Sequence, residues 1–419
     1  MRIDSDDPAA AAALDALRRS VCAHGATFSP HVCTLTRAGE LTITADAAVD
    51  PEARLMQIPD TCLPEIDAFT LTVRDGALQI DAERDDLPEP ARAGLHRLLD
   101  VYNACGKLGA WRRDCPWFAL GADPELMAAV ADLRRGAPKV AKQRDLAVRG
   151  DAEALLVTSF LGTRTFNLRA PPTGNGASGS AAADTGQSGD RTVLMPFVDF
   201  LNHDSRARPY QVSVDGDGVR RLWTHADRPV PGSAECFVRY APLDATDTYL
   251  HYGFVDASAP MLKSVPVELN LPDGAVISAG ARGGPAFQGK LPAHMQDLRF
   301  FVPPILDSRS GDHLAVARLF LPGPQAPRAL RRVLAFLIAV IRPNQDAAAQ
   351  HAAVLAAEAQ VLAENRNRFD DLGRLVEAAR ARPPADPPPG REAALAAVER
   401  LVAEGRKRLD AYARRMGLG

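Results

Sequence analysis

The first part of the chain alternates apolar and polar positions, after one short amphipathic segment. Leu14 and Leu17 lie three residues apart within residues 8–20, which predicts a helix. Alternation then predicts strands over residues 40–45, 54–58, 68–74 and 77–80, with a turn at Asp75-Gly76. Residues 20–90 are therefore expected to form a β-rich region.

Helical spacing replaces this alternation between residues 91 and 160. Leu95, Leu98 and Tyr102 recur at helical intervals within residues 91–106, and Pro90 suits the first turn of that helix. The pattern predicts further helices over residues 124–135 and 151–160. Because strand patterns lie on both sides, we interpret residues 91–160 as a helical insertion.

Strand patterns return in residues 161–260. Residues 164–169 and 191–200 are strand-like, and the segment between them, 171–190, consists mainly of Gly, Ser, Ala, Thr and Pro, which predicts a disordered loop. Residues 210–214 and 219–223 flank Asp-Gly-Asp-Gly, a hairpin signal. A short strand over 236–240 and helical turns over 246–252 complete this region.

The end of the chain is predicted to be helical. Apolar residues recur at helical spacing over residues 311–320, 327–342, 346–380 and 391–416, with a proline-rich loop at 383–390. Helices with short joints are typical of an antiparallel bundle, which we place at 311–416 after a connecting segment, 261–310. The predicted fold class is α+β: a β-rich domain with an inserted helical subdomain, followed by an all-α C-terminal domain.

Composition narrows the class of protein. The 419 residues suffice for two or three domains, and 49 basic against 52 acidic side chains give no basic excess for nucleic acid. The first residues lack the pattern of a signal peptide, and roughly 18 unbroken apolar residues, enough for a membrane span, occur nowhere. We expect a soluble cytoplasmic protein that binds neither nucleic acid nor membrane.

Cysteine and histidine placement predicts no metal site. The six cysteines include no C-x-x-C pair, so they read as small apolar core residues. Cys22-x-His24 and His31-x-Cys33 hold four possible zinc ligands, but one-residue gaps are not the usual knuckle spacing. Neither a phosphate loop nor a dinucleotide fingerprint occurs.

Two segments place polar or aromatic residues at predicted strand ends. Asn202 and His203 follow the largely apolar run 194–201, and Tyr240 closes the strand 236–240. Tyr252 and Phe254 flank a glycine shortly afterwards. Taken singly, an Asn-His pair is more typical of a turn than of a binding site, and a tyrosine that closes a strand is more often a core residue.

Together and in this order, these segments resemble the SET-domain protein methyltransferases, in particular the subfamily of the plant Rubisco large-subunit lysine methyltransferase. The resemblance runs through Arg164-Thr165-Phe166, Pro196-x-x-Asp199-x-x-Asn202-His203, Tyr240 and residues 249–256 (YLHYGFVD). The helical insertion and the helical C-terminal domain fit the same subfamily. The β-rich region is thus identified as a SET domain, with its N-terminal part at 20–90 and its C-terminal part at 161–260.

The resemblance implies a cofactor, a substrate and residue roles. S-adenosylmethionine is the implied methyl donor, and a lysine of a protein substrate is the implied acceptor, held by the SET domain and the helical domain of a monomer. Tyr240 is implied to be catalytic. Arg164, Phe166, Asn202, His203 and Phe254 are implied to bind the cofactor, whereas Tyr252 and backbone carbonyls near Thr163 and Asp199 are implied to bind the substrate.

Three alternatives remain open from the sequence. A histidine acceptor is one, although a phenol at Tyr252 narrows the channel and favours a slim lysine stem. A SET-derived binding module without turnover is another, because Glu40 and Thr42 stand where the family carries glycines, and Glu52 and Ala241 also replace glycines. A plain helical adaptor over residues 310–416 would leave the Asn-His and Tyr segments unexplained.

Overall fold

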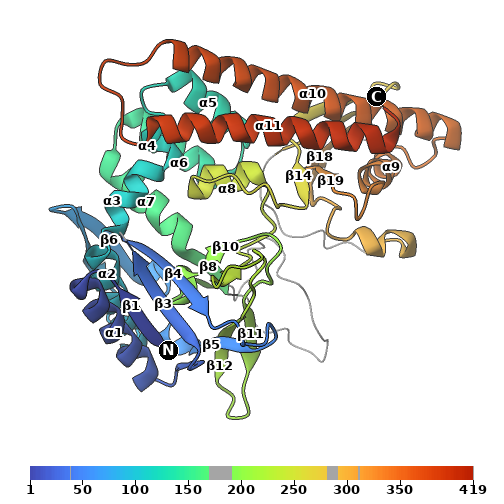
Figure 1. Cartoon of the computed structure of the whole chain (residues 1–419). Coiled ribbons are helices and arrows are strands. Elements are labelled where there is room, and N and C mark those ends of the chain that lie inside the picture. The colour runs from blue at the N-terminus through green and yellow to red at the C-terminus, as the bar shows by residue number, and fades with distance from the viewer. Residues whose placement is uncertain (38, 169–190, 281–290, 310–311, 419) are drawn as a thin grey trace. The chain divides into compact units, whose positions relative to one another are not determined.

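The computed structural model describes residues 1–37, 39–168, 191–280, 291–309 and 312–418 (Figure 1). Within these residues the chain divides into two compact units. The first comprises residues 1–113, 151–168 and 191–242, and the second comprises residues 114–150 and 243–418. The loop predicted over 171–190 lies outside the described residues.

The first unit combines short strands with a few helices. Its helices are α1 (Pro8–Ala23), α2 (Glu89–Ala104), α3 (Lys107–Asp114, whose last residue begins the second unit) and α7 (Ala152–Arg164). Its 3₁₀ turns are η1 (Asp60–Cys62), η2 (Ile66–Ala68) and η3 (Val198–Phe200). Its strands are β1 (Arg2–Ser5), β2 (Thr27–Phe28), β3 (Val32–Arg37), β4 (Glu40–Ala45), β5 (Arg54–Pro59), β6 (Phe69–Arg74), β7 (Ala77–Glu83), β8 (Thr165–Leu168), β9 (Arg191–Leu194), β10 (Asn202–His203), β11 (Gln211–Val214), β12 (Arg220–His225) and β13 (Phe237–Val238).

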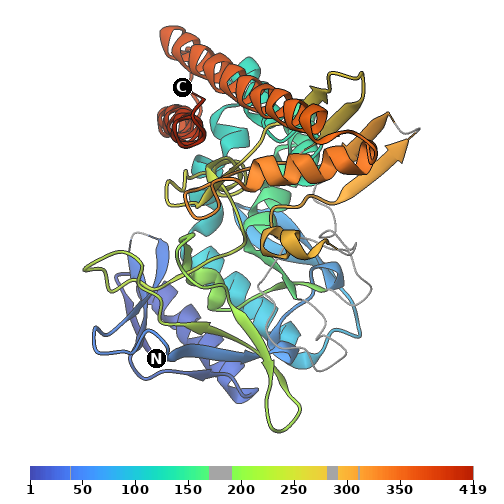
Figure 2. The ribbon, with the colours of Figure 1, turned by 90° about the vertical axis from the view of Figure 1, so that its right-hand side faces the viewer.

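Small separate sheets make up the β-structure of this unit. One has the order β1-β3-β4 and another the order β11-β12-β5-β2, while β6-β7, β8-β9 and β10-β13 form pairs. In β3 and β4 every second residue is buried, as expected for a sheet with one covered face. Helix α1 begins at the cap Asp7 and buries Leu14, Leu17 and Val21. The β11-β12 hairpin projects from the unit (Figure 2).

The second unit is mainly helical. Its helices are α4 (Pro116–Ala119), α5 (Pro124–Asp132), α6 (Pro138–Arg149), α8 (Ala245–Tyr252), η4 (Ala293–Leu298), α9 (Ala329–Ile341), α10 (Ala347–Ala381) and α11 (Arg391–Met416). Its strands are β14 (Met261–Lys263), β15 (Val267–Asn270), β16 (Val276–Ala279), β17 (Ile305–Arg309), β18 (His313–Val316) and β19 (Phe320–Pro322). The strands form a sheet β15-β16-β18-β17 and a pair β14-β19.

Helices α10 and α11 lie side by side along much of their length (Figure 1). Their contact buries Phe369 and leaves Gly405 so close that an added Cβ would lie 2.5 Å from the Phe369 ring. One buried polar cluster joins three helices: Tyr412 donates a hydrogen bond to Glu358 at 2.5 Å, and Arg331 pairs with the same carboxylate at 2.7 Å. Among the described residues, no helix is both long and apolar enough to cross a membrane.

The α+β class and the helical C-terminal region are confirmed, as are the helices predicted in residues 8–20, 91–106, 124–135, 151–160, 327–342, 346–380 and 391–416. The helix predicted over 311–320 is wrong. In β18, Leu314 and Val316 alternate with less buried positions, and the strand pairs with β16 and β17. The apolar residues of this segment therefore follow the two-residue period of a strand and not the period of a helix. The C-terminal part is therefore not all-α, and residues 261–310 contribute strands rather than only a connection.

Candidate active site

Two segments that are far apart in sequence meet at the carboxyl ends of two short strands. Asn202 and His203 form β10, which pairs in parallel with Phe237 and Val238 of β13. Beyond this pair, the Tyr240 backbone N–H donates to Nδ1 of His203 at 3.1 Å. Because Nδ1 accepts this hydrogen bond, the proton of the neutral ring lies on Nε2, which is 3.2 Å from the Ser205 hydroxyl. The Asn-His and Tyr segments are thus adjacent, as the resemblance implies.

Tyr240 has a defined orientation within this group. Its phenol donates a hydrogen bond to the backbone carbonyl of Leu201 at 2.7 Å. The His203 ring centroid lies 5.1 Å from its ring, and Phe166 packs edge-on at 5.8 Å. Phe166 also packs edge-on against Tyr210 at 5.7 Å. The Tyr240 ring therefore lies just beyond the end of β13 and packs against one phenyl ring and one imidazole ring.

Asn202 offers an exposed amide beside this group. Its Nδ2 donates to the Glu235 carboxylate at 2.7 Å. His203, in contrast, is buried, with only 7% of its surface exposed. The pair therefore combines an accessible hydrogen-bonding side chain with a buried ring that fixes the backbone of Tyr240.

Arg164 and Asp199 form a buried ion pair at 3.3 Å. Arg164 ends α7, directly after Thr163, whose hydroxyl donates to the Phe160 carbonyl at 2.7 Å. Burial alone would lower the pKa of Arg164, but the Asp199 carboxylate raises it by more than that. The net pKa is therefore above the usual value, and the guanidinium stays charged. Its Nε is buried and has no hydrogen-bond partner among the described residues.

Tyr102 joins this ion pair, although the sequence indicated only a core position for it. Its phenol donates to Asp199 at 2.5 Å, and its side chain is buried. The only sequence signal was a phenol within an otherwise aliphatic helical stripe, which does not identify a partner. The first unit therefore brings together Tyr102, Arg164, Phe166, Asp199 and the Asn202–Tyr240 segments.

Tyr252 and Phe254 belong to the second unit. Tyr252 ends α8, and its ring lies 6.1 Å from that of Phe254. Gly253, between them, has a φ of 79°, and an added Cβ would lie 2.3 Å from the Asp114 carbonyl oxygen. Only glycine fits there without a shift of the backbone. The local conformation that presents both rings is therefore fixed.

A buried charge cluster holds the start of α8. Asp244 and Asp247 form a capping box at the helix N-terminus. Arg134 pairs with both carboxylates, at 2.6 and 2.8 Å, and Lys263 pairs with Asp247 at 2.5 Å. Two cations thus balance two anions in a site where none of the four side chains is more than 9% exposed.

His251, also on α8, gives a pH-dependent prediction. Burial and the nearby Lys139 lower the pKa of His251 to about 3, with Asp247 acting in the opposite direction. Between about pH 6.5 and about pH 3 the unfolded chain takes up a proton that the folded chain refuses. Stability should therefore fall as the pH drops through this window, by up to about 1.4 kcal/mol per pH unit for this one proton.

Urea unfolding of the wild type and of His251→Gln at several pH values measures this effect. The slope of stability against pH should be smaller in the variant. His351→Gln, which changes an exposed histidine of α10, is the control and should retain the wild-type slope. Parallel curves for the wild type and His251→Gln would contradict the assignment.

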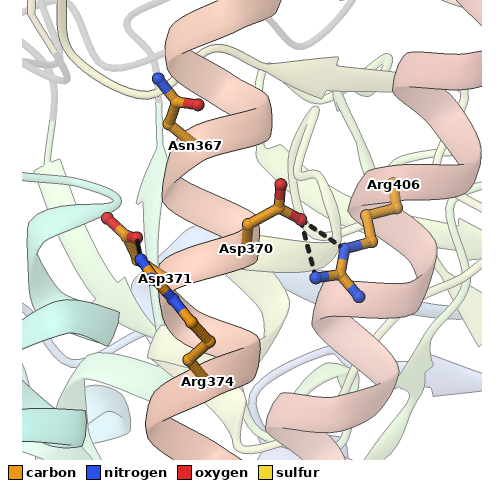
Figure 3. Close-up of a pocket in the computed structure, with 5 residues that line it drawn as sticks. All are labelled: Asn367, Asp370, Asp371, Arg374 and Arg406. Atoms are coloured by element: carbon orange, nitrogen blue, oxygen red, sulfur yellow. Dashed lines mark hydrogen bonds and ion pairs between the residues drawn. The ribbon is translucent and has the colours of Figure 1, made fainter.

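An open surface hollow lies on α10 and α11 (Figure 3). It is lined by Asn367, Asp370, Asp371, Arg374 and Arg406. The charges already pair with one another, Asp370 with Arg406 at 2.7 Å and Asp371 with Arg374. These exposed pairs are individually weak, and the hollow offers no aromatic surface for an adenine ring. It is a poor candidate for the cofactor site.

The histidines of the cysteine-histidine segment pair with carboxylates instead of gathering with the cysteines. His24 lies 3.2 Å from Glu89, and His31 lies 3.2 Å from Asp46. Among the described residues, no three His, Cys, Asp or Glu side chains are grouped as metal ligands.

Comparison with known proteins gave matches only among solved structures. No protein-family model matches the sequence. No curated protein matches it either. The chain is similar to the SET domain of LSMT bound to lysine and AdoHcy, with a TM-score of 0.41 and 12% identity over 96% of this chain and 93% of that chain. It is also similar to Rubisco LSMT bound to AdoMet, with a TM-score of 0.42 and 11% identity over 96% and 92% of the two chains.

Proposed function

We propose that this chain is an S-adenosylmethionine-dependent methyltransferase that acts on a lysine side chain of a protein. One observation carries the proposal: Asn202-His203 pairs with the strand that leads into Tyr240, although more than thirty residues separate them. These are the segments through which the sequence resembles SET-domain methyltransferases. Their connection through the His203 ring is what a shared site would need.

The residues in the first unit suit this cofactor. Phe166 and His203, each only 7% exposed, would form the packed wall behind the adenine, and Asn202 offers an exposed amide for the polar amino-acid end. Within the part of the chain that the structure describes, the buried Arg164 Nε–H has no acceptor, and such a group is costly unless a ligand oxygen pairs with it. When bound, S-adenosylmethionine would supply an electrophilic methyl group on a sulfonium sulfur.

Methyl transfer to an amine requires mainly that the protein align the amine nitrogen with the methyl carbon and the sulfur. The amine lone pair forms the N–C bond as the S–C bond breaks, and the product then loses a proton to water. Holding the reacting atoms in line can supply about 7–11 kcal/mol of the barrier. A free lysine has a pKa near about 10.4, so partial desolvation must favour its neutral form. The Tyr240 phenol, held by Leu201, is the oriented dipole for this task.

The resemblance implies that Tyr252 lines the channel for the acceptor, and on that basis we infer that the acceptor is lysine. A phenol in the wall of a narrow channel leaves room for an unbranched aliphatic stem more readily than for an imidazole. The C-terminal helices of the second unit would hold the protein substrate. Incubation with S-[methyl-³H]adenosylmethionine and a cell lysate, followed by mapping of labelled peptides, tests this proposal: labelled lysine supports it, whereas labelled histidine would redirect it.

Asn202→Ala should weaken S-adenosylmethionine binding by roughly 10-fold, because the cofactor would lose one hydrogen bond. Isothermal titration calorimetry of the wild type and the variant measures the change. Asn367→Ala, which removes an exposed amide on α10, is the matched control and should bind as the wild type does. Equal affinity of Asn202→Ala and the wild type would contradict the placement of Asn202.

A binding module without turnover is the second candidate, favoured by β4. Glu40 and Thr42 replace the family's glycines and lie within the β3-β4 ladder, and Glu40 also pairs with Lys107 at 2.7 Å. Gly39, next to them, lies against the Cys105 carbonyl, where an added Cβ would come within 2.6 Å. The same calorimetry separates the candidates, because a binding module would show no affinity at high micromolar cofactor.

A further inference from the structure

A largely buried cluster of a phenol, a carboxylate and a guanidinium lies at the turn that precedes the Asn202-His203 segment. Tyr102 of α2 donates to Asp199 of η3 at 2.5 Å, and Arg164 at the end of α7 pairs with the same carboxylate at 3.3 Å. The Asp199 side chain is only 2% exposed. Two helices of the first unit, α2 and α7, are thus tied to one carboxylate of η3.

The cluster is also packed on its aromatic side. The Arg164 guanidinium lies 4.6 Å from the Phe160 ring centroid and 5.1 Å from that of Tyr102. The two rings themselves pack edge-on at 5.2 Å. A guanidinium held between aromatic rings and a carboxylate has little freedom to move. Asp199 is therefore anchored from two directions.

The protonation state of Tyr102 suits a permanent donor. Burial and the negative charge of Asp199 raise the pKa of Tyr102 well above its usual value, against the opposite effect of Arg164. The phenol therefore keeps its proton at any pH at which the enzyme would work. Asp199 correspondingly keeps the same hydrogen bond throughout.

The anchored turn leads directly to the group that orients Tyr240. Asp199 is the middle residue of η3, and the next residue after this turn, Leu201, accepts the Tyr240 phenol at 2.7 Å. On the other side of η3, Phe197 has a φ of 65°, a strained conformation for a bulky residue. Such a backbone conformation persists only where the surrounding structure stabilises it. The contacts of Asp199 with Tyr102 and Arg164 contribute to that stabilisation.

We propose that Tyr102 is a positioning residue for methyl transfer: through Asp199 and the η3 turn it sets the Leu201 carbonyl, and thereby the direction of the Tyr240 phenol. This inference rests on the proposed function, since it assigns Tyr240 the task that Tyr102 supports. It extends the site to α2, where the sequence resemblance names no residue.

Tyr102→Phe tests the inference by two independent measurements. The first is the rate of methyl transfer to the lysine substrate, for which we expect kcat to fall roughly 10- to 100-fold with little change in KM. The second needs no turnover: in protein labelled at the tyrosine Cζ with ¹³C, the Tyr240 resonance, assigned with Tyr240→Phe, should shift in Tyr102→Phe. The chain has only 6 tyrosines, so the spectrum is simple.

Tyr412→Phe is the matched control. Its phenol also donates to a buried carboxylate that pairs with an arginine, Glu358 with Arg331. Both variants should lower the melting temperature by a similar amount. Only Tyr102→Phe should also shift the Tyr240 resonance and lower kcat. If Tyr102→Phe does not fold, Asp199→Asn, which keeps an acceptor for Tyr102 but not the charge, should shift the same resonance.

The outcomes separate this inference from the proposed function. An unchanged Tyr240 resonance together with an unchanged kcat in Tyr102→Phe would overturn the positioning role and leave the methyltransferase assignment intact. Absence of methyl transfer by the wild type would overturn the proposed function, whereas a shifted Tyr240 resonance would still support the structural link. A shift of equal size in Tyr412→Phe would overturn the inference, because it would show a general loosening of the fold.

Discussion

Tyr240→Phe is expected to lose methyl transfer while retaining the cofactor. The substitution removes one oxygen atom and keeps the ring that packs against Phe166 and His203. The fold and the surfaces that would bind the adenine should therefore persist, and the affinity for S-adenosylmethionine should stay within a few fold. The rate should fall by at least about 100-fold, the usual cost of removing one preorganised polar group at a reacting centre.

The matched control is Tyr210→Phe. Tyr210 packs edge-on against the same Phe166, and its phenol also donates to a backbone carbonyl, that of Asn167, at 2.9 Å. It differs from Tyr240 in the acceptor of its phenol, because Tyr240 donates to Leu201, the residue that directly precedes the Asn202-His203 pair. Tyr210→Phe should retain the rate within a few fold. A fully active Tyr240→Phe enzyme would remove Tyr240 from the reaction.

The parts of the fold with a strong period were predictable from the sequence. Helices α10 and α11 repeat apolar residues over many turns, and the alternation in residues 40–45 identified β4. Short segments were less predictable. In residues 311–320, Leu314 is two residues from Val316 and three from Ala317, so the run fits either period, and only pairing with β16 and β17 decides for a strand.

The candidate site likewise has a part that the sequence predicts and a part that it does not. Asn202, His203 and Tyr240 were singled out from their order along the chain, and the structure brings them together, while their roles stay predictions. Tyr102 was not identified, because a helical stripe marks a residue as buried but says nothing about which carboxylate its hydroxyl meets. A contact between residues 97 positions apart is a property of the folded chain, and no local pattern encodes it.

The charge cluster at α8 was missed for a related reason. Arg134 lies in the helical insertion, and its partners Asp244 and Asp247 follow more than a hundred residues later. Read along the sequence, each is an ordinary charged residue near a helix end. Removal of these four side chains from water is costly, and their mutual pairing is what offsets that cost. The cluster therefore specifies where α8, the helix that ends at Tyr252, begins.

Asp247→Ala should accordingly destabilise the second unit by about 3–5 kcal/mol, because it leaves Lys263 buried without its carboxylate and Arg134 with only Asp244. Asp15→Ala, which removes a surface carboxylate paired with Arg18 and Arg19, is the control and should cost no more than about 1 kcal/mol. Urea unfolding monitored by circular dichroism measures both changes.

A double substitution distinguishes charge pairing from packing at this site. Asp247→Leu with Lys263→Met removes one anion and one cation and fills the space with apolar atoms, so it should recover more than half of the stability lost in Asp247→Ala. If the cluster acted only through the helix cap, Lys263→Met would bring no recovery, because Lys263 does not belong to the capping box. Equal instability of the double variant and Asp247→Ala would therefore show that the loss comes from the helix start rather than from an unpaired buried charge.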